Sequence, residues 1–73
     1  MITIFGLKRR IVNDCKVYFG NEIFKEIDET NDTCDVVLNR YTTVIYSGEI
    51  VTIDFHDLTF CIEISDFHYM AIS

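Results

Sequence analysis

The sequence EIVTIDFHDLTFCIEIS, residues 49–65, decides the fold because apolar and polar side chains alternate along it. Alternation with a period of two places every second side chain on one face of a β-strand. With a two-residue turn at residues 56–57, Ile53 lies opposite Phe60 and Val51 lies opposite Ile62. The large apolar side chains then share one face, and a slip of one residue would mix the faces. The stretch therefore predicts a β-hairpin with a fixed register.

The residues before this hairpin predict a second one. Gly48 favours a turn at residues 47–48, because glycine accepts the positive φ that many tight turns need. Residues 41–47 then form a strand in which Val44 lies opposite Val51 on the apolar face. Two independent turns thus agree on one buried face, and such consistency favours the assignment.

The residues after the first hairpin predict a third one. A turn at residues 65–66 would place Ile62 opposite Tyr69, so that residues 67–73 form a terminal edge strand. Strand-forming residues also occupy positions 34–38. Residues 39–40 are interpreted either as a hairpin turn or as a bulge in one long strand.

The first 29 residues are less uniform. Residues 1–5 predict a short strand. Residues 7–19 carry an apolar stripe at helical spacing, with a hairpin turning at residues 13–14 as the alternative. Residues 21–29 predict a short helix, with Asn21 as its cap.

These assignments predict a single α+β domain over residues 1–73. Its centre is an antiparallel β-meander of four to five strands, with one or two short helices packed on one face. Residues 1–5 would add an edge strand. The alternative is an all-β small barrel, in which residues 7–27 form strands.

Charge is distributed unevenly along the chain, whose net charge is −6. Residues 1–20 carry four basic side chains and one acidic one, whereas residues 21–73 carry two basic and eleven acidic ones. Such a field repels nucleic acid and attracts a basic partner. We interpret the basic triplet at residues 8–10 as neutralising nearby carboxylates, because it is too short for a nucleic-acid site.

The acidic balance suggests a protein-interaction module that binds a basic surface of a larger protein. It would act as an inhibitor or a nucleic-acid mimic, since small inhibitors encoded by phages have this general composition. The expected contact residues are Asp54, Glu63, Glu49 and Asp66. Alternatively, the acidic side chains only keep a small, aromatic-rich domain in solution.

The second functional hypothesis is a self-associating structural or accessory domain. The terminal strand at residues 67–73 has no charged side chain apart from His68, and no Lys or Pro to protect its edge. His68, Met70 and Ile72 would form an apolar face covered by a second copy or by residues 1–19. We therefore expect either a homodimer or an internal partner strand.

No motif predicts catalysis, a cofactor or a metal site. The repeat Asp-Phe-His at residues 54–56 and 66–68 carries ligand-type side chains, but a strand separates the two copies by roughly 25 Å. We therefore expect no enzyme, no direct nucleic-acid binding and no membrane association. Three cysteines without a CxxC pair and the absence of a signal-type leader predict a cytoplasmic protein.

Overall fold

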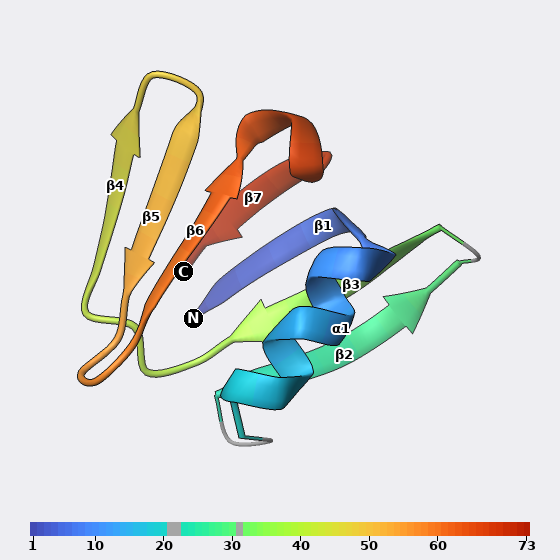
Figure 1. Cartoon of the computed structure of the whole chain (residues 1–73), viewed down its shortest axis with the longest axis horizontal. Helices are drawn as coiled ribbons and strands as arrows, with labels where there is room; N and C mark the ends of the chain where they lie inside the picture. Colours follow the sequence, from blue (N-terminus) through green and yellow to red (C-terminus); the bar gives the residue numbers. More distant parts are fainter. Residues whose placement is uncertain (21–22, 31) are drawn as a thin grey trace.

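The computed structural model describes residues 1–20, 23–30 and 32–73 (Figure 1). This part of the chain contains seven strands, one α-helix and one 3-10 turn. In chain order these are β1 (Ile2–Lys8), α1 (Arg9–Tyr18), β2 (Phe24–Glu29), β3 (Thr33–Leu38), β4 (Thr43–Ser47), β5 (Ile50–Asp54), β6 (Thr59–Glu63), η1 (Ile64–Asp66) and β7 (Tyr69–Ile72).

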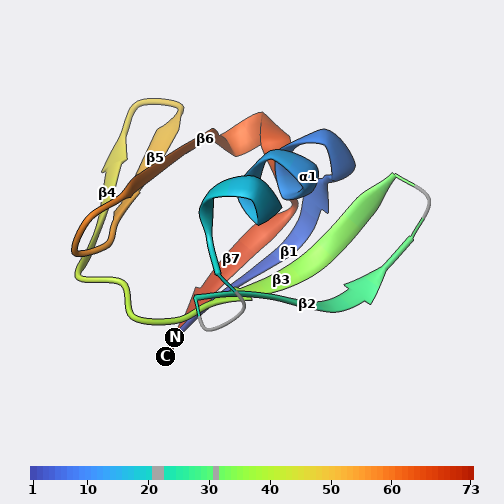
Figure 2. The same cartoon turned by 60° about the horizontal axis from the view of Figure 1, so that its bottom comes forward.

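The strands form two antiparallel sheets, one in the order β2-β3-β1-β7 and one in the order β4-β5-β6. Figure 2 shows the two sheets inclined to each other, with α1 above the larger sheet and beside β6. The predicted α+β class is confirmed, and the sheets do not close into a barrel.

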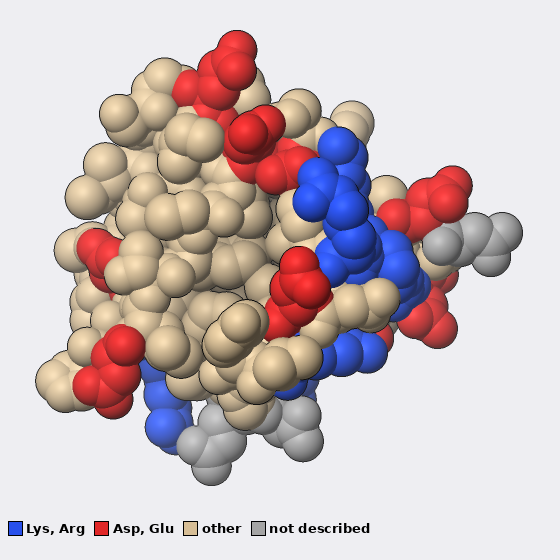
Figure 3. All heavy atoms as spheres, viewed as in Figure 1, with Lys and Arg blue, Asp and Glu red and all other residues tan. Residues whose placement is uncertain are grey.

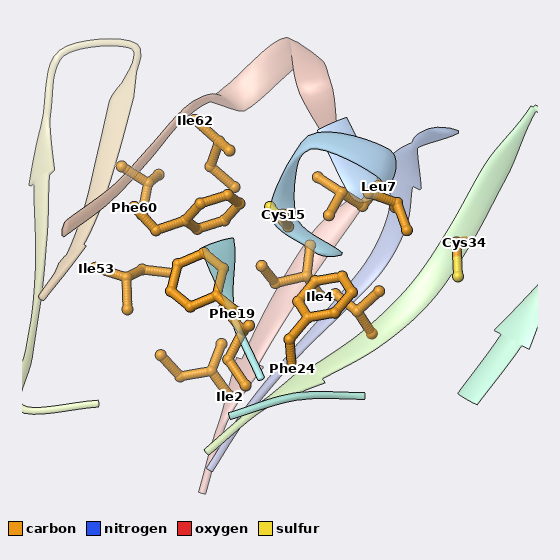
Figure 4. Packing of buried hydrophobic residues seen from close by; sticks show 14 of the residues in the cluster. Ile2, Ile4, Leu7, Cys15, Phe19, Phe24, Cys34, Ile53, Phe60 and Ile62 are labelled. Carbon is orange, nitrogen blue, oxygen red and sulfur yellow. The ribbon is translucent and has the colours of Figure 1, made fainter. Parts of the chain in front are cut away.

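The hydrophobic core lies between the two sheets and α1. Phe19, the residue after α1, lies at the centre of this core. The centroid of its ring is 5.2 Å from that of Phe55, 5.8 Å from that of Phe60 and 6.4 Å from that of Phe24. Figure 4 shows labelled side chains of both sheets and of α1 pointing into this shared space. The buried cluster draws on both sheets, so neither sheet buries its apolar face alone.

The hairpin predicted from residues 49–65 is confirmed. Ile53 pairs with Phe60 and Val51 pairs with Ile62. The turn before it is displaced, because residues 48–49 form the turn and Val44 therefore pairs with Ile53. Gly48 has the expected positive φ of 60°. A shift of two residues keeps the same side chains on the same face, so the alternation alone did not distinguish the two registers.

Residues 7–19 contain the predicted helix, and the hairpin alternative is wrong. The helix begins at Arg9 because Leu7 and Lys8 still belong to β1, where they pair with β3. Val12 and Cys15 are its buried residues. The amide of Phe19 donates to the carbonyl of Cys15 at 2.8 Å and ends the helix.

The helix predicted over residues 21–29 is wrong, because Phe24–Glu29 forms strand β2. Pairing with β3 satisfies its backbone groups, and this overrides the weak helical stripe. Phe24 is buried, whereas Ile27 of the same predicted stripe is exposed. The expected cap, Asn21, lies outside the described residues.

The predicted pairing of the terminal strand with β6 is also wrong. Residues 64–66 form η1 in place of a hairpin turn, and β7 then pairs with β1, so that Met70 lies opposite Ile4. Residues 1–5 therefore do supply the expected internal partner strand, but β1 lies between β3 and β7 and is not the expected edge strand. The faces are reversed, because Met70 packs against the core while Tyr69 is exposed.

Candidate protein-binding groove

The predicted acidic contact residues do not form one cluster. Asp54 and Glu63 lie near opposite ends of the three-stranded sheet, where they pair with Thr59 and Ile50. The carboxylate of Asp54 accepts hydrogen bonds from the hydroxyls of Thr43 and Thr59, both at 3.0 Å. Glu49 is exposed in the turn between β4 and β5.

Asp66 differs from the other three because only 8% of its surface is exposed. Its carboxylate lies 3.6 Å from the Lys8 ammonium and 3.4 Å from the Arg10 guanidinium. It also accepts the amide of Glu63 at 2.9 Å. Asp66 therefore fixes η1 against β1 and α1 from inside the fold.

The basic side chains near the start of the chain pair with carboxylates, as the sequence suggested. Lys8 and Arg10 contact Asp66, as above. Arg9 lies 3.1 Å from Glu29, and Lys16 forms an ion pair with Glu26. Figure 3 shows Lys and Arg gathered over α1, with a broad area of uncharged side chains over the three-stranded sheet.

The residues expected to mediate self-association are in different environments. His68 is exposed, and Ile72 is 50% exposed. Met70 is half-buried, and its sulfur accepts the Tyr46 hydroxyl at 3.7 Å. Met70 is therefore covered by the core of the same chain, including Tyr46 of the other sheet.

A groove of about 470 Å³ lies between α1 and β6. Ile11, Cys15 and Phe19 line it from the helix side, and Leu58 and Phe60 line it from the sheet side. Arg10 and Asp14 stand on its rim. This groove combines an apolar floor with a charged rim, as ligand sites commonly do.

The wall of this groove is a sheet edge. Phe55 donates its amide to the carbonyl of Leu58, and Ile64 donates to that of Glu49, both at 2.8 Å. Because antiparallel pairing alternates along a strand, the peptide groups of Thr59 and Cys61 point away from β5. The amide of Glu63 also points away, since it donates to Asp66. Within the described residues, β6 has β5 as its single partner strand.

Sequence reasoning missed this groove because it placed residues 67–73 beside β6. That pairing would have covered the edge. The stripe of Ile11 and Cys15 on the predicted helix was the available signal, but its position against the sheet depends on contacts between distant residues.

The cysteine beneath the groove is not a nucleophile at neutral pH. Burial, and to a smaller extent the charge of Asp14, raise the pKa of the Cys15 thiol from 9.0 to about 12. Burial likewise raises the pKa of Cys34. Both thiols therefore stay protonated, and a protonated thiol is a poor nucleophile.

Among the described residues, no group of three or more His, Cys, Asp or Glu side chains is placed to hold a metal ion. α1 is too short and too polar to cross a membrane, and the described residues contain no other α-helix.

No protein-family model, curated protein or solved structure matches the chain.

Proposed function

We propose that the protein is a protein-binding module that takes up an extended segment of a partner along the free edge of β6. The observation that carries the proposal is the pair of outward peptide groups, at Thr59 and Cys61, facing the groove beside α1. An extended segment added to a sheet edge gains main-chain hydrogen bonds, and pockets beside the edge select its side chains.

The groove favours a segment with alternating side chains. Residues of the segment that share the face of Phe60 would lie over Ile11 and Cys15, so they should be apolar. Residues on the opposite face would lie beside Cys61 and Glu63.

The charge of the rim favours a basic segment. Glu63 is exposed, and Asp14 has no ion pair within the described residues. Arg10 is compensated by Asp66, so it does not cancel these charges. Together with the net charge of −6, this attracts a segment that carries Lys or Arg at its outward positions.

The proposal is one of binding without catalysis, and the protonated thiols of Cys15 and Cys34 support it. Inhibition of the partner, or mimicry of a nucleic acid, stays a prediction. We place the protein in a reducing compartment such as the cytoplasm, because its cysteines are free and Cys61 is exposed.

Selection from a library of random short peptides on the immobilised protein tests the proposal. Enriched peptides should alternate apolar and basic residues. In titrations followed by the amide NMR signals of the protein, the largest changes should fall on Thr59 and Cys61. Failure to enrich any peptide, or changes confined to another surface, would refute the assignment.

A matched pair of variants isolates the role of the strand edge. Cys61→Pro removes the outward amide without removing a bond to β5, and proline is tolerated at such edge positions. Cys61→Val keeps that amide. We expect Cys61→Pro to lose at least about tenfold in affinity, equal to about 1.4 kcal/mol, while Cys61→Val binds as the parent does. Equal binding by both variants would contradict the proposal, and far-UV circular dichroism verifies that each is folded.

A further inference from the structure

The three-stranded sheet has a second free edge at β4, on the side opposite the groove. Ile45 of β4 and Ile50 of the adjoining β5 lie on the outer face of this sheet and are 53% and 38% exposed, whereas Tyr46 lies on the opposite face and is 58% exposed. An unpaired strand with exposed apolar side chains at a sheet edge is a template for pairing with another strand.

The edge of β4 lacks the features that usually prevent such pairing. Its sequence, TVIYS, has no charged residue and no proline. The edge strand β2 differs, because it carries four charged side chains and a register shift between Glu26 and Asp28. Charged residues and bulges of this kind discourage association between edges.

The backbone of β4 is suited to antiparallel pairing. Ser47 and Ile50 flank the two-residue turn, so their peptide groups bond to each other, and those of Ile45 and Thr52 do the same. The peptide groups of Val44 and Tyr46 therefore point to the free edge.

We infer that β4 pairs with β4 of a second copy of this chain, about a two-fold axis at Ile45. Val44 then lies opposite Tyr46 of the second copy, and Thr43 lies opposite its Ser47. Ile45 lies opposite its own counterpart. The two three-stranded sheets become one sheet of six strands, in the order β6-β5-β4-β4-β5-β6. This inference does not depend on the groove at β6.

The symmetry of this edge favours a second copy as the occupant, because pairing about Ile45 matches the outward peptide groups of Val44 with those of Tyr46 in the other chain. Two chains of net charge −6 repel each other over most of their surfaces, so they can meet only where the surface is neutral. The edge of β4 is such a place, and pairing about a two-fold axis matches each uncharged side chain with another. A basic partner would gain no electrostatic attraction from this strand.

The contact is short, since β4 has five residues. Interfaces below about 1,200 Å² form weak complexes. We therefore expect a dimer that dissociates on dilution, in the micromolar to millimolar range of about −8 to −4 kcal/mol. Each copy retains its β6 edge at the far side of the joined sheet.

Cysteine cross-linking tests this register. The backbone hydrogen bonds of Ile45 point to β5, so Ile45 and its counterpart in the second copy form a non-hydrogen-bonded pair across the axis. Their two Cβ atoms would be about 4.5–5.5 Å apart, close to the spacing that a disulfide bridges. In a Cys61→Ser background, Ile45→Cys should form a covalent dimer rapidly with oxidised glutathione. The matched control is Ile27→Cys, which is similarly exposed on the charged edge strand β2. Equal cross-linking rates for the two variants would overturn the inference.

The mass in solution provides an independent test. The parent protein should approach twice its monomer mass as its concentration rises in sedimentation equilibrium, and Ile45→Lys should remain a folded monomer. Ile45 points outward, so lysine there does not disturb the core. If Ile45→Lys nevertheless unfolds, Thr43→Lys on the same exposed face replaces it. A parent that stays monomeric up to about 1 mM, the weak end of the expected affinities, would refute the inference.

Discussion

The two sheets of this protein differ in how their strands are joined. In the three-stranded sheet, each strand pairs with the next one along the chain across a two-residue turn. In the four-stranded sheet, β1 pairs with β3 and with β7, so that Ile2 lies between Leu38 and Ile72. Local pairing follows from the alternation of side chains, whereas distant pairing depends on which edges remain available.

The two sheets also differ in what holds them. Both ends of the chain meet in the four-stranded sheet, where the amide of Ser73 donates to the carbonyl of Met1 at 2.9 Å. The three-stranded sheet is attached to the rest of the fold through its apolar face, where Phe55 and Phe60 both pack against Phe19. Within the described residues, neither outer strand of this sheet, β4 or β6, pairs with a further strand on its other side.

The largest effect should come from removing that attachment. Phe60→Ala deletes the ring that packs edge-on against Phe19 and should lower the unfolding free energy by about 3–5 kcal/mol. Such a loss would unfold most of a marginally stable domain. Chemical denaturation measures it, and Val17→Ala, at a position that is 79% exposed, is the control. A loss below about 1 kcal/mol, well short of a core truncation, would show that the sheets are held together elsewhere.

Two glycines provide a matched comparison of the sheets. Gly6 in β1 and Gly48 in the β4–β5 turn both have positive φ, at 71° and 60°. A Cβ on Gly6 would lie 2.9 Å from the Cβ of His68, whereas one on Gly48 would meet no atom within 4 Å. Gly6→Ala therefore adds a steric clash between β1 and the segment before β7 to the backbone strain that both variants share.

We expect Gly6→Ala to cost about 2–4 kcal/mol, from strain and overpacking together. Gly48→Ala should cost about 1 kcal/mol, from strain alone. Thermal denaturation of the two variants side by side measures the difference. If Gly48→Ala were the more damaging, the local turn would matter more to stability than the joining of distant strands, and the contrast between the sheets would be reversed.

The same contrast explains what could be predicted from the sequence. The pairing of Ile53 with Phe60 follows from the alternation within one hairpin. Residues 24–29 form a strand because they pair with the edge of β3. The apolar spacing of these residues gave no sign of that pairing. β7 does not pair with β6, because Asp66 accepts the amide of Glu63 and η1 replaces the expected hairpin turn. Asp66 is held by Lys8 and Arg10, which are far away in the chain, so this contact could not be predicted from the local sequence.

The candidate site was hidden for the same reason. The acidic residues Asp54 and Glu63 were apparent from the sequence, but the groove exists only because β7 pairs with β1. Its floor then joins Cys15 of α1 to Phe60 of β6, two residues brought together by the fold. Sequence alternation thus identified the strand but not its free edge.

The effect that is smallest at neutral pH concerns the floor of the groove, and it grows in alkaline solution. The Cys15 thiol has a pKa of about 12 in the fold and 9.0 as its ordinary value. Between these two values the unfolded chain binds fewer protons than the native protein, so the unfolding free energy falls as pH rises. Cys15 should contribute about 1.4 kcal/mol per pH unit to this slope, and little below about pH 8, where the thiol of the unfolded chain is still mostly protonated. Urea denaturation at several pH values measures it. Cys15→Val should flatten the alkaline slope, whereas Val12→Ala, at a buried position of the same helix that does not titrate, should leave it unchanged. Identical slopes for the parent and Cys15→Val would mean that water reaches this thiol, and the floor between α1 and β6 would then be open in solution.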